Sequence, residues 1–159
     1  MGRAPLSPRQ IEPEAERLIH ATGADFRVGG DSAYYVPSHD FILVPPQAAF
    51  LNQINYYRTC FHELGHWTGH AARLARDLTT KFGTKDDARE ELVAEMASAF
   101  LCAEMGIVPT VRHADYLANW LDVLREDKRA VFRAASLASK AADFVLTFRT
   151  PQEMGQCTV

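Results

Sequence analysis

Two histidines and a glutamate lie close together near the middle of the chain. In Phe61-His62-Glu63-Leu64-Gly65-His66-Trp67 the histidines are four residues apart, and the glutamate directly follows the first. If this stretch is helical, about 3.6 residues per turn place both imidazoles on one face, one turn apart. Two such imidazoles can share one zinc ion, while Glu63 points sideways toward the open coordination position, where a carboxylate can take a proton from water. The spacing therefore predicts a metal site with hydrolytic chemistry.

This H-E-x-x-H pattern of zinc metalloproteases needs a third protein ligand, with the fourth position left to water. Just downstream, Gly69 falls where the longer H-E-x-x-H-x-x-G-x-x-H pattern has a glycine, but Ala72 stands where that pattern has its third histidine. His70 follows the glycine at once, so it continues the line of the helix instead of returning to the metal. We therefore expect the third ligand from further along the chain.

A better source of that ligand is the acidic and apolar run over residues 90–100. From Leu92 on the run is apolar nearly all round, which predicts burial. Glu95 lies inside this run, and Glu91 lies one turn before it on the same face. A buried carboxylate costs on the order of several kcal/mol unless it is paired or bound to a metal, so both are candidates. Glu90 we assign to the start of the helix, where acidic residues are common and stabilising.

The elements that position these residues can be predicted from periodicity and turn signals. Helical spacing covers residues 8–22, with Pro13 as an alternative start, then the His62–His66 stretch, 86–104, 113–125 and 127–148. Three short strands at 25–28, 33–36 and 41–44, joined by tight turns, indicate an antiparallel meander. We therefore expect an α+β domain over residues 8–148, with a small antiparallel β-meander packed on about five helices. Residues 1–7 and 149–159 are expected to be flexible termini.

Composition limits the classes of function. The chain has 159 residues, which suits one domain, and its net charge of −3 exerts no general attraction on nucleic acid. Its three cysteines, Cys60, Cys102 and Cys157, are too few and too unpatterned for a disulfide framework. No apolar run reaches membrane-spanning length, and the first residues lack the apolar core of a signal peptide. A cytoplasmic protein that does not bind a membrane is the simplest interpretation.

Four segments together resemble the C-terminal zincin-like domain of the ArdC-type antirestriction proteins, which include primase-like proteins of conjugative plasmids. The segments are residues 61–70, Gly29-Gly30-Asp31-x-Ala33-Tyr34-Tyr35, Arg89-Glu90-Glu91-Leu92-Val93-Ala94-Glu95 and Asp127-Lys128-Arg129-Ala130-Val131-Phe132-Arg133-Ala134-Ala135-Ser136. Together they span roughly residues 8–148, almost the whole chain.

The resemblance implies a gluzincin fold and a role for each site residue. Zn²⁺, with Mn²⁺ as the alternative ion, would be held by His62, His66 and Glu91, and Glu63 would be the catalytic base. Glu95 would hydrogen-bond a ligating histidine, although the reverse assignment of Glu91 and Glu95 stays open. The implied function is that of a metallopeptidase-like domain of an antirestriction protein, which hydrolyses a peptide bond in a protein or peptide substrate.

Zincins usually bind an extended peptide along the edge strand that precedes the active helix. This expectation places Tyr34 or Tyr35 near the substrate, although core packing is an alternative for aromatic residues on short strands. A donor to the transition state is also expected, and its candidates are Tyr34, Tyr35 and His113. For His113, the alternative to a donor role is a surface position at the start of a helix.

Other functions remain open from the sequence. Family members usually carry an N-terminal domain that binds single-stranded DNA, and no segment here corresponds to it, so we expect no nucleic-acid binding by this domain alone. One alternative is a non-catalytic, metal-stabilised module that inhibits a host restriction or defence protein, and another is a hydrolase of non-peptide substrates. Arg73, Arg76 and Lys81 are predicted to lie in a solvated loop, with contact to an acidic substrate as the alternative.

Overall fold

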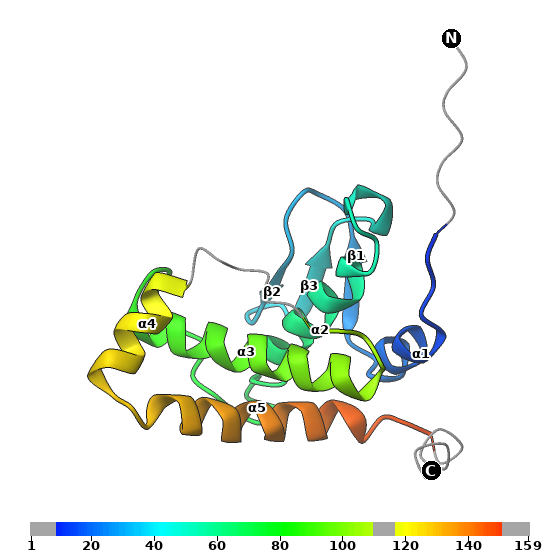
Figure 1. Ribbon diagram of the computed structural model, residues 1–159. Helices are drawn as coiled ribbons and strands as arrows, with labels where there is room; N and C mark the ends of the chain where they lie inside the picture. Colours follow the sequence, from blue (N-terminus) through cyan, green and yellow to red (C-terminus); the bar gives the residue numbers. More distant parts are fainter. Residues whose placement is uncertain (1–8, 110–116, 151–159) are drawn as a thin grey trace.

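The computed structural model describes residues 9–109 and 117–150. Its elements in chain order are α1 (Pro13–Ala21), β1 (Asp25–Val28), β2 (Tyr34–Val36), β3 (Phe41–Val44), the short 3-10 helix η1 (Gln47–Ala49), α2 (Asn55–Trp67), α3 (Lys85–Glu104), α4 (Leu117–Glu126) and α5 (Ala130–Leu146). The sheet packs on α2, α2 packs on α3, and α3 lies along α5 (Figure 1). This layered arrangement confirms the expected α+β class.

The sheet differs from the expected meander in one pairing. Its strand order is β1-β3-β2. β2 and β3 form the predicted antiparallel hairpin, with Tyr35 opposite Ile42, but β1 pairs with β3 in parallel, with Phe26 opposite Ile42. The expectation of a fully antiparallel meander is therefore wrong, and β3 is the central strand.

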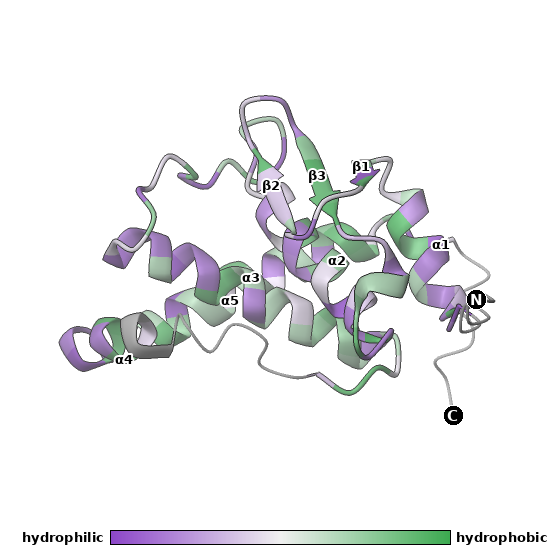
Figure 2. Cartoon of the chain, turned by 90° about the horizontal axis from the view of Figure 1, so that it is seen from above, coloured by the Kyte–Doolittle hydropathy of each residue, from purple (hydrophilic) through white to green (hydrophobic). Residues whose placement is uncertain are grey.

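Hydrophobicity explains why β3 takes the central position. All four residues of β3 are apolar, and Ile42 and Val44 are fully buried. By contrast β1 reads Asp-Phe-Arg-Val, and its burial pattern shows no fully buried residue. Figure 2 shows β3 in the green of hydrophobic residues. A continuous apolar run favours a central strand, which has a neighbouring strand on each side, whereas a sequence with charged residues favours an edge strand.

Helix α2 forms the middle of the core. Its side chains Tyr57, Phe61 and Leu64 are fully buried and join a cluster that includes residues of β3, α1 and α5. Trp67, at the end of the helix, is also buried, with 5% of its surface exposed. The helix ends at Trp67, directly before Thr68 and Gly69. The core therefore fixes the orientation of the helix that carries the two histidines.

A glycine lets α2 and α3 approach closely beside the histidines. A Cβ atom at Gly65 would lie 3.0 Å from the Cα atom and 3.3 Å from the carbonyl oxygen of Ala94. Because Gly65 lies directly before His66 and Ala94 directly before Glu95, this contact holds the histidine face of α2 against the acidic face of α3.

Helix α3 begins at Lys85, one residue before the predicted start. The Thr84 hydroxyl accepts a hydrogen bond from the Asp87 backbone N–H at 3.2 Å, and the Asp87 carboxylate accepts one from the Gly83 N–H at 2.9 Å. The first contact satisfies a backbone donor that the first turn of a helix otherwise leaves unpaired, and the second holds the residue before the N-cap against the helix.

Several predicted features fall on residues that the structure does not describe. His113 and the predicted start of the fourth helix lie outside the described residues, as do residues 1–8 and 151–159, which hold most of the predicted termini. Within the described part of the chain, no helix combines the length and apolar character needed to cross a membrane.

Candidate metal centre

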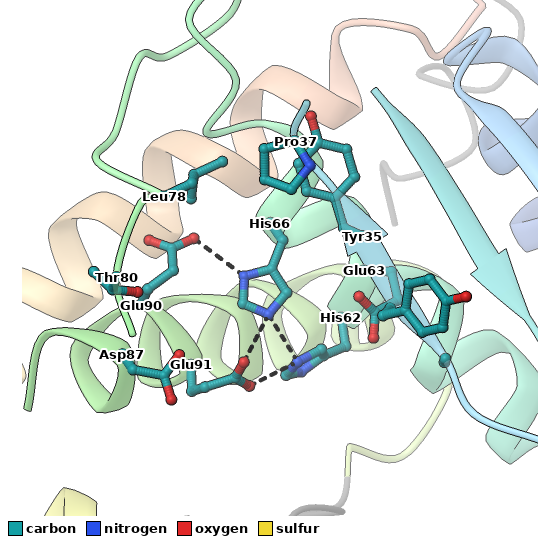
Figure 3. A pocket seen from close by; sticks show the side chains of 12 residues that line it. Tyr35, Pro37, His62, Glu63, His66, Leu78, Thr80, Asp87, Glu90 and Glu91 are labelled. Atoms are coloured by element: carbon teal, nitrogen blue, oxygen red, sulfur yellow. Dashed lines mark hydrogen bonds and ion pairs between the residues drawn. The ribbon is translucent and has the colours of Figure 1, made fainter. Parts of the chain in front are cut away.

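Three side chains from two helices converge on one point. The Nε2 atoms of His62 and His66, both on α2, are 3.2 Å apart. The carboxylate of Glu91, on α3, lies 3.1 Å from His62 Nε2 through one oxygen and 3.2 Å from His66 Nε2 through the other. Figure 3 shows the three side chains pointing toward one another. In the described part of the chain, these residues form a cluster with the composition and spacing of a metal site.

The spacing of these atoms suits a tetrahedral ion. Zinc binds imidazole nitrogen and carboxylate oxygen at about 2.0–2.2 Å, so neighbouring ligand atoms of a tetrahedron lie about 3.3–3.6 Å apart. The observed separations of 3.1 and 3.2 Å are close to that value. Two imidazoles and one carboxylate also leave a fourth position open, as catalytic zinc sites do. The donor set and its geometry therefore fit a divalent metal.

The outward-facing nitrogens of both imidazoles contact carboxylates. His62 Nδ1 lies 3.2 Å from Glu95 Oε1, and His66 Nδ1 lies 3.2 Å from Glu90 Oε1. A carboxylate at Nδ1 holds the imidazole hydrogen there and leaves the Nε2 lone pair directed at the metal position. The structure thus gives Glu91 and Glu95 different places, which the sequence left open: Glu91 faces the inner nitrogens and Glu95 the outer nitrogen of His62.

The ionisation of the cluster follows from burial and these contacts. Burial lowers the pKa of His62, but the hydrogen bonds to Glu91 and Glu95 outweigh it and raise that pKa to about 9. Burial also lowers the pKa of His66, but the hydrogen bonds to Glu90 and Glu91 outweigh this effect and raise that pKa well above its ordinary value. Burial raises the pKa of Glu91, yet the two histidines hold it well below its usual range. Glu91 therefore stays anionic beside the imidazoles, and both rings carry a proton that a metal would displace from Nε2 on binding.

Glu63 borders the same pocket. The pocket has a volume of about 240 Å³, and its walls come from the residues around β2, from α2, from the loop after α2 and from α3. Glu63 is 5% exposed, and Figure 3 shows its side chain beside the two imidazoles. The predicted base therefore shares a cavity with the predicted ligands.

The two tyrosines predicted near a substrate both line this pocket, but they differ in exposure. The Tyr35 hydroxyl donates a hydrogen bond to Asp40 Oδ1 at 2.7 Å and accepts one from Arg73 Nη2 at 3.2 Å. Tyr34, by contrast, is 45% exposed. Of the two phenols, that of Tyr35 is therefore already held by the protein, and Tyr34 is the better placed to meet a ligand.

Two residues that the sequence analysis assigned to other roles also belong to the site. Glu90 was predicted only to stabilise the start of its helix, yet its side chain is 11% exposed and contacts His66. Arg76 was predicted to lie in a solvated loop, yet its side chain is 8% exposed and pairs with Glu90 at 2.9 Å. Arg73 is also largely buried, whereas Lys81 is exposed as predicted. Arg76 and Glu90 lie 14 residues apart and are brought together by a loop, so no local sequence pattern indicated that they pair.

Residues that the sequence analysis set aside stay apart from the cluster. His70 accepts a hydrogen bond from the Ala72 backbone N–H at 3.0 Å. Cys60 and Cys102 are both buried, as is typical of small apolar side chains.

Comparison with known proteins places this geometry in context. A model of the family described as zincin-like metallopeptidase matches residues 13–137. A protein named DNA primase TraC from Escherichia coli is 47% identical over 146 residues, which are 91% of this chain and 14% of that protein. The chain therefore spans about a seventh of the length of this relative.

Solved structures give the same relationship. A Mn(II)-bound crystal structure of the antirestriction ArdC protein from plasmid R388 is 41% identical, with a TM-score of 0.79, and the match covers 89% of this chain and 54% of ArdC. A metal-free structure of ArdC is 40% identical, with a TM-score of 0.76 and the same coverage of this chain, 89%. The match to ArdC covers about half of that protein.

Proposed function

The chain belongs to the zincin-like metallopeptidase family, and from this premise we propose that it is the zinc-dependent peptidase domain of an antirestriction protein. Zn²⁺ is the proposed working ion, with Mn²⁺ as the alternative because one of the similar ArdC structures is Mn(II)-bound. Imidazole and carboxylate donors accept both ions, so metal measurements must separate them.

One observation carries the proposal. His62 Nε2, His66 Nε2 and the Glu91 carboxylate lie 3.1 and 3.2 Å from one another, in a pocket that Glu63 also lines. A purely structural metal site closes all four positions with protein ligands. Three converging donors, an adjacent carboxylate and an open pocket are the arrangement that hydrolysis requires.

Each residue then has a defined task. A metal held by His62, His66 and Glu91 would lower the pKa of a water molecule to about 7 and polarise a carbonyl group. Glu63 accepts a proton from the attacking water and passes it to the leaving amine as the C–N bond breaks.

The substrate is proposed to be an extended segment of a protein or peptide. β2 pairs with β3 on one side and is an edge of the sheet, and Tyr34, Tyr35 and Pro37 line the metal pocket. An edge strand offers a row of backbone donors and acceptors, so a peptide can add to it as a further strand. Tyr34, with its exposed side chain, is the proposed contact to this peptide.

A peptide library and the Glu63→Gln variant test the proposal. The zinc-loaded wild-type protein should cleave a subset of a mixed peptide library, read by mass spectrometry. Glu63→Gln should keep its zinc and lose activity by at least about 100-fold, because general acid–base catalysis contributes about 10²–10⁴-fold. Equal cleavage by the variant with full metal occupancy would exclude Glu63 as the base.

A second candidate function is a metal-stabilised module that inhibits a host restriction protein without cleaving it. The observation in its favour is that the two solved structures described above are of an antirestriction protein, and inhibition of a restriction enzyme can be achieved by binding alone. In a restriction assay in cells, Glu63→Gln should retain protection if binding suffices. If proteolysis is required, the variant should lose protection while it remains folded and metal-bound.

A further inference from the structure

Arg76 is an arginine whose charge is buried between two helices. Its side chain is 8% exposed. Nε donates to Glu90 Oε2 at 3.0 Å and Nη2 to Glu90 Oε1 at 2.9 Å, while Nη1 donates to Thr68 Oγ1 at 3.0 Å and Nη2 also to the Gly65 carbonyl at 2.6 Å. Gly65 and Thr68 flank the turn of α2 that carries His66. The guanidinium therefore forms hydrogen bonds to α3 and to the C-terminal end of α2 at the same time.

These hydrogen bonds fix the position of the Glu90 carboxylate, which contacts His66. Both oxygens of Glu90 accept from Arg76, and Oε1 also lies 3.2 Å from His66 Nδ1. Two parallel hydrogen bonds from a planar guanidinium leave a carboxylate little freedom to rotate. The orientation of the His66 ring, and so the direction of its Nε2 lone pair, is then set by Arg76 through Glu90.

The packing around Arg76 leaves no room for a side chain at position 69. A Cβ atom at Gly69 would lie 2.9 Å from Arg76 Nη2 and 3.1 Å from its Cζ, and 3.0 Å from Leu78 Cδ2. An added methyl group would therefore force the Arg76 guanidinium, the Leu78 side chain or both to move. The glycine is therefore an independent sign that the position of this guanidinium is closely constrained.

Arg73, from the same loop, links that loop to the β2–β3 turn and to the end of α2. Its guanidinium pairs with Asp40 in the β2–β3 turn and lies 3.9 Å above the Trp67 ring, with a side chain that is 12% exposed. None of these contacts involves the metal cluster. The two arginines match in burial and loop position but differ in whether they contact the carboxylate that lies against His66.

We propose that Arg76 and Glu90 are positioning residues for the metal ligand His66. This inference rests on the proposed metal centre. Zinc affinity should fall about 10–100-fold when the contact is disturbed, as is typical when a group that orients a metal ligand is lost. Glu90→Gln removes the charge at constant shape, and Gly69→Ala crowds Arg76 while it leaves both charges in place. Arg73→Gln, the matched control, should leave zinc affinity unchanged.

The test is the zinc dissociation constant of the full chain, measured in competition with a chromophoric chelator. Circular dichroism and thermal unfolding establish that each variant is folded. Co²⁺ substituted for zinc adds a readout of ligand geometry, because its visible absorption bands should shift in Glu90→Gln and Gly69→Ala but not in Arg73→Gln.

The outcomes distinguish failure of the positioning role from failure of the proposed function. Wild-type affinity in both Glu90→Gln and Gly69→Ala would overturn the positioning role and leave the proposed function intact. An equal loss of zinc affinity in Arg73→Gln would also overturn it, because the effect would then come from the attachment of the loop and not from the contact with Glu90. A wild-type protein that binds neither zinc nor Co²⁺ would overturn the proposed function and this inference together.

Discussion

Each histidine of the cluster uses both ring nitrogens. The Nε2 atoms lie 3.2 Å apart on the inner side, while Glu95 and Glu90 each lie 3.2 Å from an outer Nδ1. Because a carboxylate at Nδ1 fixes the tautomer and the ring plane, it prepares the opposite nitrogen for a metal. At the scale of residues, the site consists of inner donors and of the acidic side chains that aim them.

Glu95→Gln tests the division between inner and outer carboxylates. The variant should still bind zinc, but about 10–100-fold more weakly, because it keeps the ligands and loses the anion that orients His62. Calorimetric titration with zinc measures this effect. Glu91→Gln is the matched control and should bind far more weakly than Glu95→Gln. The opposite ranking would make Glu95 the ligand.

Sequence patterns located most of these residues but not all of their roles. The spacing of His62 and His66 and the buried acidic helix pointed to the cluster, since helical periodicity fixes which residues share a face. The choice between Glu91 and Glu95 depends on how α3 is rotated against α2, which no local pattern encodes. Glu90 was missed because its partner Arg76 reaches it through a loop whose path the sequence does not reveal.

At the scale of elements, the close contact of α2 and α3 brings donors from two helices together. Gly65 faces Ala94, and a Cβ at Gly65 would lie 3.0 Å from the Ala94 Cα. Backbone atoms cannot rotate away as a side chain can. Any side chain at Gly65 must therefore separate the two helices at the metal cluster.

Gly65→Ala is predicted to destabilise the protein and weaken metal binding together. Alanine favours a helix by up to about 1 kcal/mol over glycine, but overpacking costs about 1–3 kcal/mol, so the net effect should be a loss. Urea unfolding and zinc titration measure the two effects. The control is Gly29→Ala, where an added Cβ meets no atom within 4 Å. An increase in stability with unchanged zinc affinity would contradict the close-contact argument.

The β2–β3 hairpin should respond to acid through Asp40. Hydrogen bonds from Arg73 hold the pKa of Asp40 below its ordinary value, against the opposing effect of burial. A lowered folded-state pKa stabilises the protein above about pH 4 and loses that contribution as the pH falls through the folded-state value. Asp40→Asn should therefore lower the free energy of unfolding at pH 7, by less than about 1 kcal/mol because the Asp40 side chain is 38% exposed.

The difference between wild type and Asp40→Asn should shrink as the pH falls below about 4. Thermal unfolding of both proteins across this range measures it. A gap that stays constant or widens in acid would show that the Asp40 charge is not what ties the turn to Arg73.

Strand positions were predictable, but the pairing direction of β1 was not. Residue types and turn signals placed all three strands within one residue of their observed bounds. A tight turn between β2 and β3 requires an antiparallel pair, whereas residues 29–40, which include β2, separate β1 from β3 and are long enough to allow a parallel pair. The fully apolar composition of β3 was the available sign that it lies in the centre.

At the scale of the whole molecule, the cluster joins parts of the chain that are far apart in sequence. α2 belongs to the core shared with the sheet, and α3 packs between α2 and α5. A metal that binds residues of both helices therefore ties the two halves of the domain together. Binding and folding should be coupled, because an unfolded chain has no preformed site.

Zinc should raise the thermal stability of the domain. At a free zinc concentration about 100 times the dissociation constant, binding adds about 2.7 kcal/mol to the free energy of unfolding. For a chain of this size, such a gain corresponds to a rise in Tm of about 5–10 °C. Differential scanning calorimetry with and without zinc measures the shift, and a chelator should reverse it. An equal shift in His66→Ala would assign the effect to zinc bound elsewhere.

The most direct test of the metal centre is the metal content of the untagged protein, purified without chelator and measured by elemental mass spectrometry. The proposed site predicts about one zinc per chain in the wild type and in Glu63→Ala, and loss of that zinc in His66→Ala and Glu91→Ala. Manganese at the same stoichiometry would keep the site and change the ion. A wild-type protein that holds no metal, even after zinc or manganese is added back, would contradict the metal centre.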